Sequence, residues 1–193
     1  MTRSPPPPPS HLDTPLHLDD ASPIVPLAPV HNQLLSGQAF GGFFLNFVLN
    51  GFMAWVTFPP VAALPLFARG NCVAGDTVGT GFFLPLTTCL ILTPIVRRML
   101  RKDAVPALDR AELHRFIRFW PRNFIARGVV VGLISAFTFA PWTLFFISNM
   151  GVTAMTRNED ILYKAIYTAI LGAIVTPLLG LRALADVPPA PQP

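Results

Sequence analysis

Charged residues are scarce in this chain, and that scarcity defines its class. Only 12% of the 193 residues are Asp, Glu, Lys or Arg, against about a quarter in an ordinary soluble domain. Four apolar segments, near residues 40–61, 80–96, 128–148 and 161–181, approach the ~20 residues that a helix needs to cross a bilayer. The alternative, a soluble helical bundle, would leave too few polar residues to cover four such segments. We therefore predict an all-α integral membrane protein with four transmembrane helices.

The chain also has few cysteines and no spacing of metal-binding residues. The two cysteines are Cys72, in the first predicted loop, and Cys89, inside the second predicted span. Their depths differ too much for an obvious disulfide, and no Cys or His spacing is typical of a metal site. His11, His17 and His31 all fall in a proline-rich tail. We expect no metal and no cofactor.

The first 36 residues have no continuous apolar run of the kind found in a cleavable signal peptide. They contain nine prolines, including the run "PPPPPS", which predicts a disordered tail with local polyproline II character. Such a tail can be a ligand for adaptor modules, but a solvated spacer is the plainer interpretation. The ending, residues 185–193, is interpreted in the same way.

Signatures of catalysis are missing as well. The sequence contains no Gly-x-Ser-x-Gly elbow, no His-Glu-x-x-His zinc motif and no phosphate-binding P-loop. The predicted spans carry no pair of histidines or carboxylates suited to acid–base chemistry. We expect that the protein is not an enzyme.

The basic residues are distributed unevenly along the chain. Nine of the fourteen lie between the second and third predicted spans: Arg97, Arg98, Arg101, Lys102, Arg110, Arg115, Arg118, Arg122 and Arg127. Because loops rich in Lys and Arg stay inside, this central loop is predicted to be cytoplasmic. Four spans then place both termini in the cytoplasm, as in a multi-pass protein of the cell inner membrane.

The central loop contains an amphipathic pattern, "DRAELHRFIRFW". Asp109 and Glu112 have the spacing of a capping box, and Leu113, Phe116, Ile117 and Trp120 fall on one helical face. We predict a basic helix in residues 103–126 that rests on the inner leaflet and contacts the phosphates of anionic lipids. Its candidate contacts are Arg110, Arg115, Arg118 and Arg122. A nucleic-acid or protein partner is the alternative, and we expect no nucleic acid.

The two halves of the apolar region resemble each other. "GFMAWVTFPP" at 51–60 shares Gly, Thr, Phe and Pro positions with "GLISAFTFAP" at 132–141, and "ILTP" at 91–94 matches "IVTP" at 174–177. Shared membrane composition is the alternative to duplication. We predict two parallel hairpin repeats, at 37–102 and 127–184. This pattern resembles a tandem copy of a small bacterial two-transmembrane-helix domain of unknown function, which implies no particular activity.

Polar residues form a stripe along the first predicted span. Asn46, Asn50 and Thr57 share one helix face with Gly42 and Ala54. The stripe either joins helices through small residues and hydrogen bonds or lines a solute path. Ion-coupled carriers usually have a charged residue near the middle of a span. The predicted spans of this chain have none.

Two function classes stay open at this level. One is a small permease-like protein, for which a homodimer would let the stripe line a shared seam. The other is a non-transporting membrane scaffold or accessory subunit. The polar stripe and four prolines inside the predicted spans favour the permease-like class; these prolines are Pro85, Pro94, Pro141 and Pro177.

Overall fold

A computed structural model describes residues 29–58, 63–102, 105, 108 and 113–186 of the chain. Most of the proline-rich N-terminal segment and the last seven residues, 187–193, lie outside the described residues. So do Arg110 and the predicted capping pair Asp109 and Glu112.

Four long helices confirm the coarse fold prediction. They are α1 (Pro29–Thr57), α2 (Val73–Arg101), α4 (Phe124–Asn149) and α5 (Arg157–Leu184). Among the described residues, these four are the helices long and apolar enough to cross a membrane. α1 begins within the segment 1–36 that the sequence assigns to a tail.

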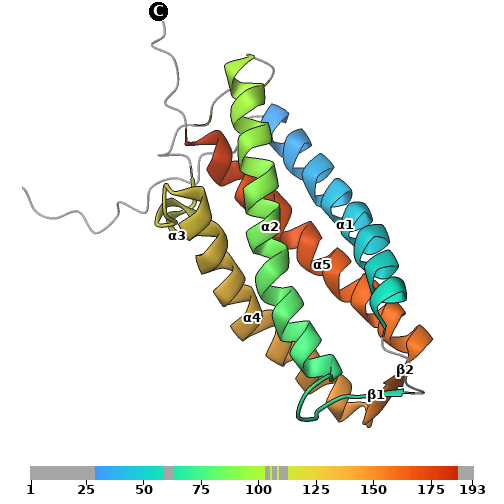
Figure 1. Ribbon diagram of the computed structural model, residues 1–193. Helices are drawn as coiled ribbons and strands as arrows, with labels where there is room; N and C mark the ends of the chain where they lie inside the picture. The colour runs from blue at the N-terminus through green and yellow to red at the C-terminus, as the bar shows by residue number, and fades with distance from the viewer. Residues whose placement is uncertain (1–28, 59–62, 103–104, 106–107, 109–112, 187–193) are drawn as a thin grey trace, which may run out of the picture.

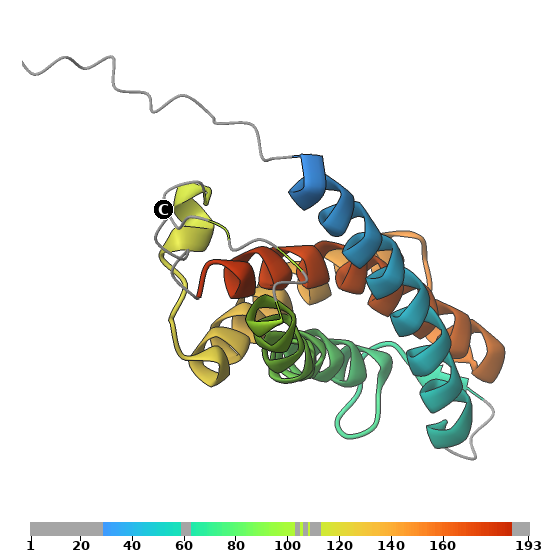
Figure 2. The same ribbon diagram turned by 90° about the horizontal axis from the view of Figure 1, so that it is seen from above.

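The helices pack in the order α1, α5, α2, α4, which differs from their order along the chain. α1 packs along α5, α5 along α2, and α2 along α4. Figures 1 and 2 show α1 and α4 on opposite sides of the central pair formed by α2 and α5. Within the described helices, α1 and α2 share no extended interface although they are consecutive.

A short β-ribbon joins the two helix connections at one end of the bundle. β1 (Ala63–Pro65) pairs antiparallel with β2 (Ala154–Thr156), and Leu64 lies opposite Met155. The sequence analysis did not predict these strands, since three residues are too short for a periodic pattern. We call this the strand end of the bundle, and the opposite end, where α5 terminates, the arginine end (Figure 1).

Glycines allow the outer helices to approach the central pair. A Cβ atom added at Gly42 of α1 would lie 2.8 Å from the carbonyl oxygen of Gly172 in α5. On the other side, a Cβ atom at Gly132 of α4 would lie 2.6 Å from the carbonyl oxygen of Phe82 in α2. Small residues at both interfaces permit the close packing that stabilises helices in a membrane.

The outward faces of α1 and α4 are strongly apolar. Without a bilayer, these large side chains are exposed, as expected for a lipid-facing surface. The most exposed aromatic residues are Phe40, Phe44, Phe52 and Trp55 on α1, and Phe137, Trp142, Phe145 and Phe146 on α4.

The predicted amphipathic segment is largely packed into the protein. Its described helical part, α3, is a single turn, Arg115–Arg118, whose start is capped by His114. Leu113, Ile117 and Trp120 are buried in the main core, whereas Phe116 is 56% exposed. The longer interfacial helix stays a prediction.

Candidate functional site

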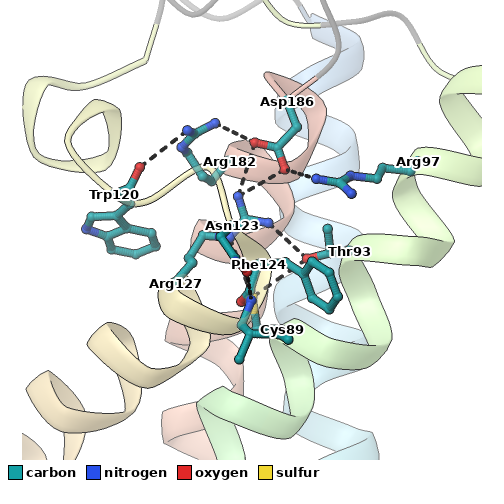
Figure 3. A network of polar contacts seen from close by, with 10 residues as sticks. Cys89, Thr93, Arg97, Trp120, Asn123, Phe124, Arg127, Arg182 and Asp186 are labelled. Atoms are coloured by element: carbon teal, nitrogen blue, oxygen red, sulfur yellow. Dashed lines mark hydrogen bonds and ion pairs between the residues drawn. The ribbon is translucent and has the colours of Figure 1, made fainter.

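Three arginines converge on the carboxylate of Asp186 at the arginine end. Arg97 of α2 lies 3.2 Å from Oδ2, and Arg182 of α5 lies 2.7 Å from Oδ1. Arg127 of α4 contacts both oxygens, at 3.2 and 3.1 Å. Figure 3 shows that these side chains approach Asp186 from three different helices. We call this set the arginine network.

Three of the four members of the network are almost completely enclosed, whereas the Arg97 side chain is 38% exposed. The side chains of Arg127 and Arg182 are 0% and 1% exposed, and that of Asp186 is 4% exposed. Arg127 also donates to Thr93 Oγ1 at 3.0 Å and to Cys89 Sγ at 3.5 Å. Buried charges are tolerated when paired and hydrogen-bonded, so the network joins α2 and α4 to the end of α5.

The sequence analysis missed the arginine network. Arg127 was counted among the basic residues of the predicted cytoplasmic loop, and Asp186 was assigned to the C-terminal tail. In the structure Arg127 points inward, because Asp186 directly follows the end of α5 and lies beside it. The available signal was the i,i+4 spacing of Arg182 and Asp186 at the end of an apolar segment.

A polar cavity of about 370 Å³ lies at the strand end. The last turn of α1 contributes Ala54 and Thr57, and the connecting loop contributes residues 70–72. The first turn of α2 contributes Asp76, and the first two turns of α5 contribute Asp160 and Lys164. We call it the strand-end cavity.

The charged groups of the cavity are unequally paired. Lys164 Nζ lies 2.8 Å from Asp76 Oδ1, so these two form an ion pair. Asp160 is only 7% exposed, yet its carboxylate accepts no hydrogen bond from any of the described residues. The nearby Lys164 ammonium favours the charged form of Asp160, but an enclosed carboxylate without a hydrogen-bond donor is costly, which makes Asp160 the exceptional residue of this cavity.

Beyond the cavity, α5 carries two stacked tyrosines. The rings of Tyr163 and Tyr167 lie 6.0 Å apart, and the Tyr163 hydroxyl lies 2.9 Å from Thr77 Oγ1 on α2. The Tyr167 hydroxyl is buried and has no hydrogen-bond partner among the described residues. Both tyrosines lie on α5 between the cavity residue Asp160 and the arginine end.

The predicted polar stripe is mostly satisfied within α1. The Asn46 amide donates to the Gly42 carbonyl at 2.7 Å, and the Asn50 amide donates to the Asn46 carbonyl at 3.1 Å. Asn46 also packs against Gly172 of α5. Thr57 is exposed, donates to the Met53 carbonyl at 2.7 Å and lines the strand-end cavity. The structure thus separates Thr57, at the cavity, from Asn46, which packs on α5.

The described candidate lipid-phosphate contacts lie together on the surface. Arg115, Arg118 and Arg122 are exposed around α3, near the arginine end. Across the part of the chain that the structure describes, no group of three or more Cys, His, Asp or Glu side chains is placed to hold a metal ion.

Comparisons with protein-family models, with curated proteins and with solved structures found no match to this chain.

Proposed function

We propose that the chain is a small, non-enzymatic, permease-like protein of the cell inner membrane, with the strand-end cavity as its outward-facing solute site. The observation that carries this proposal is Asp160, a buried carboxylate that lines a polar cavity and lacks a protein hydrogen-bond donor. Polar groups that converge in a cavity of a few hundred Å³ are the usual mark of a small-molecule site.

The positive-inside rule supports the orientation. The exposed arginines near α3 lie at the arginine end, which the proposal places in the cytoplasm together with both termini. Arg110, Arg115, Arg118 and Arg122 would contact the phosphates of anionic lipids there. The strand-end cavity then opens toward the outside.

The arginine network gives the proposal an inner closure. Its ion pairs hold α2, α4 and the end of α5 together at the side opposite the cavity. In an alternating-access cycle one side of the solute site is closed while the other is open. We propose that the structure corresponds to the state open to the outside, and that separation of Asp186 from the arginines accompanies inward opening.

The internal duplication supports a two-part carrier. Exchange of α1 with α4 and of α2 with α5 leaves the packing order α1, α5, α2, α4 the same when it is read backwards. Gly70 and Gly151, which align in the two halves, both adopt positive φ values, 102° and 80°. The proposal therefore keeps the two hairpin repeats, with their helices interleaved rather than packed as separate hairpins.

The shared-seam homodimer receives less support. Asn46 and Asn50 satisfy their amides within α1, and Asn46 packs on α5 of the same chain. We therefore propose a solute path within one chain that begins at the strand-end cavity. Of the predicted stripe, only Thr57 lines this path.

A second candidate function is favoured by the same asparagines. In a non-transporting scaffold or accessory subunit, the stripe would be satisfied and packed against another helix of the same chain. Asn46 has these properties. Under this alternative the strand-end cavity would contain only water.

Deletion of the gene and solute profiling separate these candidates. A strain without the gene is grown on a panel of small solutes, and the altered phenotypes are then complemented with the parent, Asp160→Asn or Asn50→Leu. The permease-like proposal expects Asp160→Asn to fail and Asn50→Leu to complement at least partly. Full complementation by Asp160→Asn, at equal protein levels, would favour the scaffold.

A further inference from the structure

We infer that the strand-end cavity binds its solute through a primary ammonium group, with Asp160 as the acceptor. This inference rests on the proposed function and names the class of solute. Two carboxylates, Asp76 and Asp160, and one ammonium, Lys164, line the cavity. The described lining thus carries one excess negative charge.

Lys164 shows how the cavity holds an ammonium. Its Nζ lies 2.8 Å from Asp76 Oδ1, at a side-chain exposure of 15%. This pairing leaves Asp160 as the carboxylate without a donor. A charge-assisted N–H···O bond is among the strongest hydrogen bonds that a carboxylate can accept, so a second ammonium, brought by the solute, would compensate the buried charge.

Other positively charged ligands fit the cavity less well. A hard divalent cation takes six or more oxygen ligands, whereas the described residues provide no cluster of three acidic or other metal-ligating side chains. The Lys164 ammonium within the same lining would also repel a divalent ion about twice as strongly as it repels a single positive charge. A single positive charge that brings its own N–H donors matches one unpaired carboxylate.

The size of the cavity restricts the solute further. A volume of about 370 Å³ is near the lower limit of small-molecule sites. The lining combines the apolar side chains of Ala54, Phe58 and Leu64 with polar and glycine residues. The inferred class is therefore a small primary amine.

Equilibrium dialysis of the full chain in detergent tests the inference, with radiolabelled ethanolamine and choline as probes. The two cations have the same carbon chain, but choline is quaternary and has no N–H donor. We expect saturable ethanolamine binding, and choline binding that is weaker by roughly tenfold or more, because a hydrogen bond to a charged group is lost.

Two substitutions locate the site. Asp160→Asn removes the charge with little change in shape, and we expect it to weaken ethanolamine binding by roughly tenfold to a hundredfold. Glu159→Gln is the matched control: it removes one negative charge from the adjacent position, whose side chain does not line the cavity, and binding should be unchanged. Equal binding by the parent and Asp160→Asn, equal affinity for both probes, or no binding at all would overturn the inference.

A further variant covers the case in which Asp160→Asn does not fold. Lys164→Gln breaks the ion pair and frees Asp76, so ethanolamine should bind at least as tightly as in the parent. Weaker binding by a folded Lys164→Gln protein would overturn the inference. The proposed function fails separately: ethanolamine binding without any solute phenotype contradicts the permease, and a solute phenotype without ethanolamine binding contradicts only the ammonium site.

Discussion

Arg127, in the first turn of α4, places its Nη1 atom 3.1 Å from Oδ2 of Asp186, just beyond the end of α5. The contact joins residues 59 positions apart in the chain. α4 and α5 have no extended interface between their described backbones, so this ion pair connects two helices that otherwise meet mainly through α2. The stability of the arginine end should depend on it.

Replacement of Asp186 tests this dependence. Asp186→Ala leaves the buried guanidinium groups of Arg127 and Arg182 without their shared carboxylate. Loss of one partner of a buried pair costs about 3–5 kcal/mol, and we expect a loss of this order in the free energy of unfolding in detergent. Asp76→Ala is the control, because its side chain is 45% exposed; a surface pair contributes about 1 kcal/mol or less. Equal losses for both variants would show that the network does not stabilise the fold.

Gly42 and Gly41 form a matched pair for the packing of α1 on α5. A Cβ atom at Gly42 would lie 2.7 Å from Thr176 Oγ1 and 2.8 Å from the Gly172 carbonyl oxygen, whereas one at Gly41 meets no atom within 4 Å. We expect Gly42→Ala to destabilise the protein by about 1–3 kcal/mol. Gly41→Ala should be neutral or stabilising, since alanine is the better helix former. Thermal unfolding in detergent measures both, and a reversed order would contradict the described α1–α5 contact.

The proposed orientation places Gly70 outside and the C-terminus inside. An alkaline phosphatase reporter fused after Gly70 should therefore be active, because this enzyme matures only outside the cytoplasm. A fluorescent cytoplasmic reporter fused after the last residue should be bright. An inactive phosphatase at Gly70, with the fusion protein present in the membrane, would refute the orientation.

The exposed arginines near α3 should retain anionic lipid. We expect the protein to keep bound anionic phospholipid through purification and to lose it gradually as salt rises, since screening weakens surface attraction. Replacement of Arg115, Arg118 and Arg122 by glutamine should reduce the retained lipid, as measured by mass spectrometry. Retention that is the same in the triple variant would assign the lipid to another surface.

The sequence predicts the helices well and their neighbours poorly. Four apolar segments of sufficient length identify α1, α2, α4 and α5, since length and hydropathy are local properties. The packing order is not local: α1 lies against α5 because Gly42 and Gly172 allow close approach, and neither glycine is distinctive among the thirteen glycines of the chain.

The sites were harder to predict for a similar reason. Asp160 and Lys164 were not predicted as site residues, because their relation to Asp76 depends on how α2 and α5 meet. Asn46 and Asn50 stood out as amides in an apolar segment, yet bonds within their own helix satisfy them. A polar residue in a span thus indicates a contact but does not identify the partner.

Solute uptake into proteoliposomes tests the central claim, that the strand-end cavity is the solute site of a permease-like protein. Radiolabelled ethanolamine is presented to vesicles that contain the parent, Asp160→Asn or Glu159→Gln, with protein-free vesicles to measure leakage. The account predicts uptake above leakage for the parent and Glu159→Gln, and uptake at the leakage rate for Asp160→Asn. Uptake by the parent at the leakage rate, or equal uptake by the parent and Asp160→Asn, would contradict it.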